Sequence, residues 1–247
     1  MNNSCEFIMN ESVVKIIPDE IHHKDDRLNQ YLHTIAHELR TPFVSIQGFA
    51  SLLYEEYNDS LPEGARTYLD RIITNLNRVD SLLTDITKLA KISIDKNRFE
   101  RVPALTIIDK ALDSHVIELH HKKIHMRVQP HLPKLNCDAS AMVLVFSNLI
   151  GNAIKYSHEK RGGEIEIGYS DEEIFHKFFV RDNGIGFKAA DHSKVFVLFN
   201  RLRNKNNVTG TGLGLSIVKQ VIESHGGEVW VDSKKYKGAT FYFTLPK

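Results

Sequence analysis

The chain has 247 residues, with 32 Lys+Arg against 31 Asp+Glu, a formal net charge of +1 and a mean hydropathy of −0.27. This composition is typical of a folded globular protein and excludes collagen, disulfide-rich scaffolds and disordered chains. Because the charges balance, no long-range field concentrates polynucleotides on the surface, and we predict no nucleic-acid partner.

The cysteine content and the apolar runs bear on location. Only two cysteines, Cys5 and Cys137, are present, and they have no metal-ligand or redox spacing. This predicts free thiols in a reducing, cytoplasmic compartment. The longest apolar run, Ala141 to Phe146, is too short to cross a membrane, and the amino terminus lacks the basic region of a secretion signal. We therefore predict no membrane contact within this chain, although the excised core of a membrane-attached protein would look the same.

Hydrophobic periodicity begins after the first two dozen residues. Residues 1–24 show no sustained period and are expected to form a lead-in segment. Further on, apolar residues alternate in steps of four and three, which predicts a helix with a heptad seam. The seam consists of Leu28, Leu32, Ile35, Leu39, Pro42, Ile46, Phe49 and Leu53. Because it resumes in register after the proline, we expect a bend there and not an end of the helix.

A second seam follows a polar stretch that contains Asn58, Asp59, Pro62 and Gly64. Its members are Leu69, Ile72, Leu76, Val79, Leu83, Ile86 and Ala90. Two amphipathic helices with a short connection predict an antiparallel helical hairpin over residues 25–95. Because two helices cannot enclose both seams, we predict a homodimer in which two hairpins form a four-helix bundle.

The pattern changes near residues 93–99 to helices interleaved with short alternating segments, which predicts a second domain over residues 96–247. The expected strands are 123–128, 164–170, 174–181, 228–232 and 240–245, and the expected helices are 105–121, 139–157 and 213–225. The predicted fold class is therefore α+β, with a helical hairpin followed by an α/β layer.

One histidine of the hairpin is placed for chemistry. His37, in the segment HTIAHELRTPF, falls at heptad position f and should point away from the bundle axis into solvent. Glu38 is its neighbour, and Thr41 lies one turn further on the same face. A neutral imidazole nitrogen is a nucleophile, and a carboxylate can accept the other ring N–H. By itself, an exposed helical histidine is most often only a solvated residue.

Several polar residues also lie toward the carboxyl end of the predicted helix 139–157. Asn148 and Asn152 are one turn apart and are followed by Lys155 and Tyr156. Carboxamide oxygens suit a Mg²⁺ ion held mainly by phosphates, a lysine offers charge to phosphate, and a tyrosine offers a flat face to a base. Polar capping of a helix end explains the same residues without any ligand.

The segment DNGIGF follows a predicted strand. Asp182 can accept a hydrogen bond from an exocyclic amine, and Gly184 and Gly186 let the backbone approach a ligand closely. Taken alone, such a segment is mostly a turn.

A second glycine-rich segment, GTGLGLSIVK, contains Gly210, Gly212 and Gly214 and leads into a predicted helix whose first N–H groups can meet an anion. A mobile hinge has the same composition. It is preceded by two phenylalanines, Phe196 and Phe199, and by a basic stretch that includes Arg201.

Taken together and in this order, HELRTPF, NLIGNAIKY, DNGIGF, the two-phenylalanine segment and GTGLGLSIVK resemble the H, N, G1, F and G2 boxes of the two-component sensor histidine kinases. The resemblance covers about residues 25–247. It implies a dimerisation and phosphoacceptor hairpin over 25–95, followed by an α/β-sandwich ATP-binding domain of the Bergerat type over 96–247. It also implies ATP and Mg²⁺ as cofactors and a response-regulator receiver domain as partner.

The resemblance assigns a role to each motif residue. His37 would be the phosphoacceptor and Glu38 the assisting acid, and the spacing of Glu38 and Thr41 matches relatives that also dephosphorylate their regulator. In the nucleotide site, the implied roles are Asn152 on Mg²⁺ with Asn148 in support, Lys155 and Tyr156 against the nucleotide, Asp182 on the adenine amine, Gly184 and Gly186 shaping its pocket, Arg201 on phosphate, and Gly210, Gly212 and Gly214 framing the lid and phosphates.

One position separates this chain from the related ATPases of topoisomerases, chaperones and mismatch repair. Those enzymes place a Glu one turn before the Mg²⁺-binding Asn, whereas here that position is Asn148, which cannot act as a base at neutral pH. The sequence therefore favours ATP-dependent autophosphorylation of His37 and transfer to a regulator aspartate over hydrolysis. The alternative is a catalytically silent scaffold or a phosphatase-only protein of the same fold.

Overall fold

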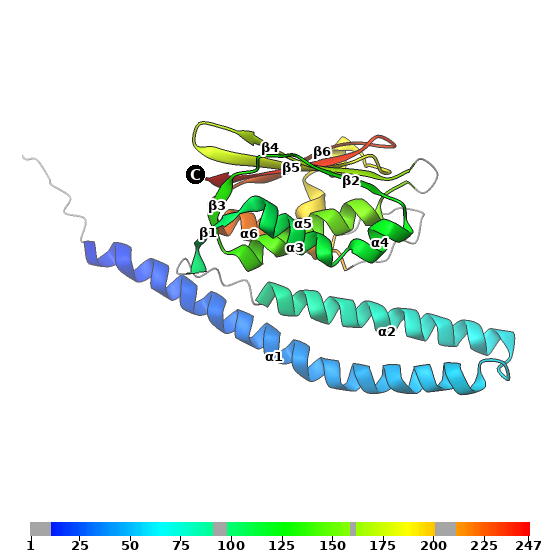
Figure 1. The fold of residues 1–247 in the computed structure, drawn as a ribbon. Helices are drawn as coiled ribbons and strands as arrows, with labels where there is room; N and C mark the ends of the chain where they lie inside the picture. The colour runs from blue at the N-terminus through cyan, green and yellow to red at the C-terminus, as the bar shows by residue number, and fades with distance from the viewer. Residues whose placement is uncertain (1–10, 91–97, 159–161, 201–210) are drawn as a thin grey trace, which may run out of the picture. The chain divides into compact units, whose positions relative to one another are not determined.

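The computed structural model describes residues 11–90, 98–158, 162–200 and 211–247, with side chains from Thr34 to Lys88 in the first range. Contacts divide the chain into two compact units, one mainly a helical hairpin and the other mainly a mixed α/β layer (Figure 1). The predicted α+β fold class is confirmed. None of the helices in the described part of the chain combines the length and the apolar character needed to cross a bilayer.

The hairpin consists of α1 (Glu11–Tyr57) and α2 (Glu63–Ala90). α1 continues through Pro42, as expected, and its axis changes direction along its length (Figure 1). α1 begins at Glu11, well before the predicted seam starts at Leu28. Extending an existing helix fixes one residue for each hydrogen bond gained, so it needs no hydrophobic period of its own.

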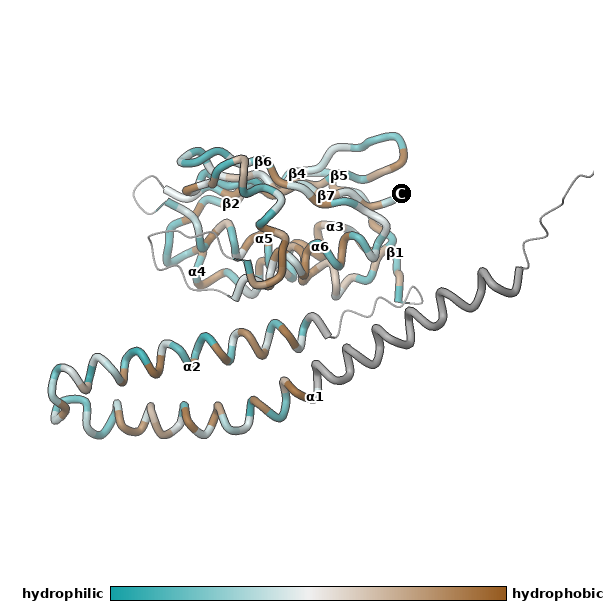
Figure 2. Tube along the Cα trace, turned by 180° about the vertical axis from the view of Figure 1, so that it is seen from behind, coloured by the Kyte–Doolittle hydropathy of each residue, from teal (hydrophilic) through white to brown (hydrophobic). Residues whose placement is uncertain are grey.

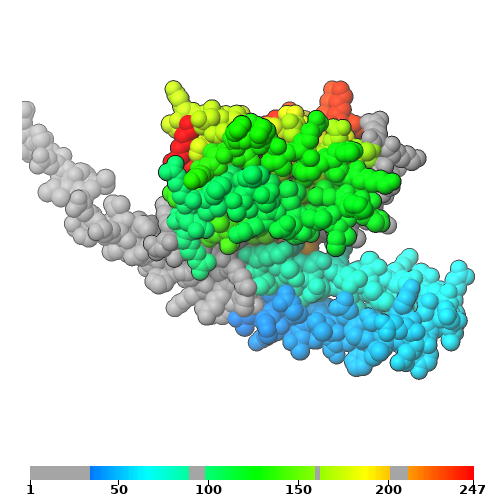
Figure 3. All heavy atoms as spheres, in the orientation of Figure 1, coloured from blue at the N-terminus to red at the C-terminus, as the bar shows by residue number. Residues whose placement is uncertain are grey.

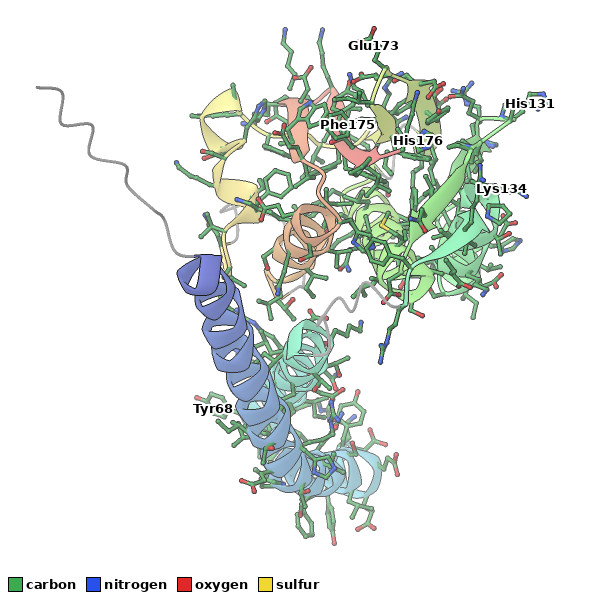
Figure 4. The ribbon with its side chains drawn as sticks, turned by 90° about the vertical axis from the view of Figure 1, so that its left-hand side faces the viewer. Tyr68, His131, Lys134, Glu173, Phe175 and His176 are labelled. Carbon is green, nitrogen blue, oxygen red and sulfur yellow. The ribbon has the colours of Figure 1, made fainter. Side chains whose placement is uncertain are left out.

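The two helices pack through a face next to the predicted seam. Ala50, Leu69 and Leu76 form a buried cluster, against which Phe43, Leu61 and Ile73 pack. The seam residues of α1 remain exposed, by 44% to 66% for Ile35, Leu39, Ile46, Phe49 and Leu53. On α2, Tyr68 also projects from the hairpin surface and is 67% exposed (Figure 4). The heptad pattern of α1 therefore marks a surface that the hairpin does not bury by itself.

The mixed unit contains a five-stranded sheet of order β2-β4-β5-β7-β6 and a two-stranded antiparallel sheet β1-β3. The strands are β1 (Glu100–Pro103), β2 (His125–Val128), β3 (Lys134–Cys137), β4 (Glu164–Asp171), β5 (Phe175–Asp182), β6 (Val229–Lys234) and β7 (Gly238–Pro246). Only the β2–β4 pair of the larger sheet is parallel. The helices are α3 (Ala104–Asp113), α4 (Val116–His121), α5 (Ala139–Lys155) and α6 (Gly214–Ser224), with short 3-10 turns at Ala189–Asp191 and Lys194–Phe196.

Helices α3, α5 and α6 cover one face of the larger sheet (Figures 1 and 2). Phe178 of β5 and Phe243 of β7 stack with their ring centroids 5.3 Å apart, and Phe146 of α5 meets both rings edge-on. All three side chains are fully buried. Aromatic rings in these arrangements add specific attraction to the burial of a large apolar area, so they fix α5 against the sheet. In the space-filling view, green residues from about 100–150 cover most of the near face of this unit, and yellow to red residues from later in the chain form its upper edge (Figure 3).

The structure corrects the expected helix 105–121, which is two helices. Ser114 and His115 interrupt it: Ser114 Oγ donates to the Ala111 carbonyl oxygen, and His115 has a φ of −119° and a ψ of 1°. A serine that bonds to a nearby carbonyl offers the backbone an alternative to continuing the helix. The strands β1 and β3, which pair Glu100 with Cys137, were not expected.

Candidate nucleotide-binding and phosphoacceptor sites

A pocket lies at the end of the sheet where β5 stops. It is bordered by the carboxyl end of α5, the loop after β5, the start of α6 and the first residues of β7. Its lining residues from α5 onward in the chain are Asn148, Asn152, Lys155, Tyr156, Asp182, Ile185, Gly186, Phe187, Val195, Asn200, Thr211, Gly212, Gly214, Leu215, Ala239 and Phe241. β5 runs from Phe175 and His176, labelled in Figure 4, to Asp182 at the pocket.

Asp182 is the buried charge of the pocket. It is only 9% exposed, and its Oδ1 accepts the backbone N–H of Gly184 at 2.8 Å and that of Ala239 at 3.3 Å. Burial raises the pKa of this carboxyl group from 3.8 to about 6, and the two backbone hydrogen bonds oppose the rise. Because both backbone donors meet Oδ1, the other carboxylate oxygen is left for a ligand.

The loop after β5 needs its glycines for close packing. A Cβ atom at Gly184 would overlap the carbonyl oxygen of Tyr156, and one at Gly186 would overlap that of Lys234. Gly186 also has a φ of +53°, which favours glycine. The Ile185 N–H donates to Tyr156 O at 3.0 Å, so this loop is fixed directly to the end of α5.

The carboxyl end of α5 carries the polar residues of the N-box motif. Asn148 Nδ2 donates to the Leu144 carbonyl oxygen at 2.8 Å, which leaves its Oδ1 toward α6. Asn152 lines the pocket one turn later, and Lys155 Nζ lies 5.2 Å from the centroid of the Tyr156 ring. Lys122 Nζ donates to Ile154 O at 3.0 Å and stabilises this helix end.

The first residue of α6 packs against α5 with no spare room. A Cβ atom at Gly214 would lie 2.6 Å from Asn148 Oδ1. We expect Gly214→Ala to displace the Asn148 side chain and to weaken nucleotide binding by about tenfold, although alanine by itself favours a helix. Titration calorimetry with ATP measures the change. Gly64→Ala, where a Cβ meets nothing within 4 Å, is the control; equal affinity in all three proteins would contradict the prediction.

The structure brings together the predicted residues of three separate motifs. Eight of them line one pocket: Asn148, Asn152, Lys155, Tyr156, Asp182, Gly186, Gly212 and Gly214. Gly184 is not among the lining residues, but its N–H donates to Asp182. Arg201 and Gly210 lie outside the described residues.

Sequence reasoning missed the apolar walls and one donor of this pocket. Ile185, Phe187, Val195 and Phe241 line it, and the Ala239 N–H donates to Asp182. The alternating pattern of the last strand indicated that Phe241 lies on one face, but not that this face borders the pocket.

The predicted phosphoacceptor lies on the hairpin. His37 is exposed on α1, as its heptad position predicts, and Glu38 and Thr41 are exposed beside it. The imidazole of His37 is therefore open to a reaction partner.

Comparisons with known proteins agree with this arrangement of hairpin and pocket. Residues 27–93 match the family described as "His Kinase A (phospho-acceptor) domain". Residues 137–247 match the family described as "Histidine kinase-, DNA gyrase B-, and HSP90-like ATPase". These two matches define the class: a phospho-acceptor hairpin joined to an ATPase-type domain.

Relatives with both parts narrow the class. The methanogenesis regulatory histidine kinase FilI of Methanothrix harundinacea is 33% identical over 92% of this chain and 25% of its own length. The phytochrome-like protein Cph1 of Synechocystis is 31% identical over 89% of this chain and 29% of its own length. Among solved structures, full-length ShkA in complex with AMPPNP has a TM-score of 0.65 at 26% identity, over 88% of this chain and 45% of that one.

The chain belongs to the two-component sensor histidine kinases and contains their catalytic core. It spans between a quarter and a third of the length of the two curated relatives named above.

Proposed function

We propose that this chain uses ATP to phosphorylate His37 and passes the phosphoryl group to an aspartate of a response regulator. The observation that carries the proposal is the single pocket that unites residues of the N, G1 and G2 motifs around a buried carboxylate. The exposed imidazole of His37 on a phospho-acceptor hairpin supplies the acceptor. The AMPPNP complex of ShkA supports ATP as the ligand.

The nucleotide roles follow from the chemistry of the lining. Asp182 accepts a hydrogen bond from the adenine amine, between the apolar side chains of Ile185 and Phe241. Lys155 brings positive charge to the phosphates, and Tyr156 offers its ring to the nucleotide. Gly212 and Gly214, at the start of α6, let phosphate approach the backbone. Arg201 and Gly210 are proposed for the phosphates from the motif alone.

The residues of α5 fit a Mg²⁺ ion. Asn152, with Asn148 in support, offers a neutral carboxamide oxygen inside the pocket. Mg²⁺ is commonly bound by one or two protein ligands together with substrate phosphates, so a single amide oxygen is enough. When bound, the ion would neutralise charge on the phosphates.

The reaction is an in-line phosphoryl transfer. A ring nitrogen of His37 attacks the γ-phosphorus, the new N–P bond forms as the bond to the β–γ bridging oxygen breaks, and ADP leaves. Glu38 accepts the other ring N–H and so favours the developing positive charge on the imidazole. Asn148 occupies the position where a carboxylate would activate water, so hydrolysis lacks a base. Positioning supplies most of the rate enhancement.

Glu38 and Thr41 are proposed to serve dephosphorylation of the regulator. The sequence spacing of the two cysteines, which predicts no disulfide, supports a proposed cytoplasmic location. We propose 1–24 as a lead-in segment, 25–95 as the phosphotransfer domain and 96–247 as the ATP-binding domain. The family matches at 27–93 and 137–247 support this division.

We also propose that the active form is a homodimer. Ala36, Phe43 and Ala50 face α2 or lie on the same stripe, and each directly follows a seam residue or the seam proline. Successive helical residues are rotated by about 100°. The buried stripe and the exposed seam therefore face two neighbours about a quarter turn apart, which is the geometry of a four-helix bundle.

We expect Phe49→Asp to convert the dimer into a monomer, because a charge would be buried within the apolar seam. Phe49 is 66% exposed in the single hairpin. Light scattering coupled to size-exclusion chromatography measures the mass. The matched control is Val44→Asp, since Val44 is 55% exposed and lies at heptad position f, away from the seam. A dimer that withstands Phe49→Asp would contradict this interface.

Incubation with Mg²⁺ and ATP labelled at the γ-phosphate tests the activity. We expect label on the protein that is lost in acid and stable in alkali, as for phosphohistidine. Nucleotide binding without label on the protein would instead favour the alternative function, a silent scaffold or a phosphatase-only protein.

A further inference from the structure

Ser233 of β6 is a buried hydroxyl outside the pocket lining. Its residue is 7% exposed and lies on the same face of the strand as buried Val231. A hydroxyl group in such a place is costly unless it is hydrogen-bonded. The function proposed above gives this residue no role.

The Ser233 hydroxyl group makes two hydrogen bonds to backbone groups. Its Oγ accepts the N–H of Phe187 at 2.9 Å and donates to the carbonyl oxygen of Gly238 at 2.9 Å. A single hydroxyl can do both, since it has one donor and two acceptor positions. Ser233 thus joins the loop after β5 to Gly238, the first residue of β7, which directly follows the turn between β6 and β7.

These two segments are the ones that hold Asp182. In the loop after β5, the N–H of Gly184 donates to Asp182 Oδ1. At the start of β7, the N–H of Ala239, which directly follows Gly238, donates to the same oxygen. Their packing is tight, because a Cβ atom at Gly238 would overlap the carbonyl oxygen of Asp182. A shift of either segment relative to the other therefore moves a donor of the carboxylate.

A second link makes the role of Ser233 separable from folding. The Tyr236 N–H donates to the Ile185 carbonyl oxygen at 2.6 Å, and this bond joins the same loop and turn without the serine. The antiparallel backbone pairing of β4, β5, β7 and β6 does not involve the serine hydroxyl group and would also remain. Loss of the hydroxyl would loosen the junction and leave the sheet intact.

We propose that Ser233 is a positioning residue of the nucleotide site: its hydroxyl group sets the spacing of the two backbone segments that orient Asp182 toward the adenine amine. This inference rests on the proposed function, because it uses Asp182 as the adenine acceptor. Ser233 itself touches no nucleotide in this scheme.

The test compares Ser233→Ala with Ser233→Thr in the full chain. We expect Ser233→Ala to raise the Kd and the KM for ATP about tenfold, since Phe187 N–H and Gly238 O lose their partner. The rate of autophosphorylation at saturating ATP stays within about twofold, because the phosphate end of the site is untouched. Ser233→Thr keeps the hydroxyl group, so its affinity for ATP is expected to match that of the unaltered chain. Amide exchange of Phe187 becomes faster in Ser233→Ala alone.

The matched control is Thr244→Val, which removes an equally buried hydroxyl from the other end of the β6–β7 pair. Thr244 is 8% exposed, and its Oγ1 accepts the Glu228 N–H at 3.0 Å. An unchanged Kd in Ser233→Ala, or an equal rise in Thr244→Val, overturns the inference. If Ser233→Ala does not fold, Ser233→Cys carries the same comparison, because a thiol is a weak donor and acceptor. If the unaltered chain binds no ATP, the proposed function fails instead.

Discussion

His37→Gln is expected to abolish acid-labile labelling of the chain by γ-labelled ATP, by at least about a thousandfold, because it removes the nucleophile. The amide nitrogen of glutamine shares its lone pair with the carbonyl group and cannot attack phosphorus. His37 is exposed on α1, so the substitution leaves the fold and the ATP affinity unchanged. Scintillation counting after acid and alkali treatment measures the label, and calorimetry measures ATP binding.

The control for this experiment is His33→Gln, the same substitution one turn earlier in α1. It should leave the label at the level of the unaltered chain. Label that persists in His37→Gln would identify a different acceptor. Label that disappears together with ATP binding would show that the substitution acts on the nucleotide site and not on the acceptor.

The hairpin shows how a sequence pattern can be right about structure and incomplete about contacts. The heptad seam predicted a long helix that continues past Pro42, and α1 does so. The seam does not show which residues pack within one hairpin, because Ile35 and Phe49 remain exposed while Ala36 and Ala50 are buried. A heptad pattern gives the helix and one apolar face, and small residues such as alanine on a second face carry little hydrophobic signal.

The nucleotide pocket was predictable where its residues lie in local motifs. Asn152, Asp182 and Gly214 belong to short contiguous motifs whose residue types indicate nucleotide chemistry, and all three line the pocket. What the sequence could not show is the pairing of distant segments. The bond from Ala239 N–H to Asp182 spans 57 positions, and the bond from Phe187 N–H to Ser233 spans 46.

The same limit explains the missed sheet. β1 and β3 have four residues each and lie more than thirty positions apart. Segments this short show too few alternations for a period-2 signal, and only their mutual pairing makes them strands. The break between α3 and α4 is similar, because His115 Nε2 lies 3.0 Å from Ser147 Oγ of α5, a contact with no local signature.

The burial of Asp182 affects both ligand binding and the stability of the folded domain. Removing a carboxylate from water favours its neutral form, and here the pKa rises to about 6. At neutral pH the group is nevertheless mostly ionised, so the folded ATP-binding domain holds a charge that is poorly solvated. In the proposed function the adenine amine donates a hydrogen bond to this carboxylate and stabilises its charge, so the buried charge would raise the affinity for nucleotide and lower the stability of the nucleotide-free domain.

Asp182→Asn is therefore expected to weaken ATP binding by about 100-fold, the second large effect in this protein. Oδ1 is held by the N–H groups of Gly184 and Ala239, so the oxygen of asparagine takes that place. Its NH₂ group then faces the adenine amine, and two donors meet. Calorimetry with ATP measures the loss, and Asp109→Asn, at an exposed position of α3, is the control.

The same variant is expected to be more stable than the unaltered chain above pH 6 when no nucleotide is bound. The folded state, with a pKa of about 6 against 3.8, binds the Asp182 proton more tightly than the unfolded chain does. The free energy of unfolding therefore falls as the pH rises from about 4 to about 6, by roughly 3 kcal/mol from this group, and stays level above that range. Asparagine does not titrate, so the two proteins should differ little at pH 4 and most at pH 7.5. Urea denaturation at four pH values between these limits measures the difference, and a gap that does not change with pH would show that Asp182 titrates normally.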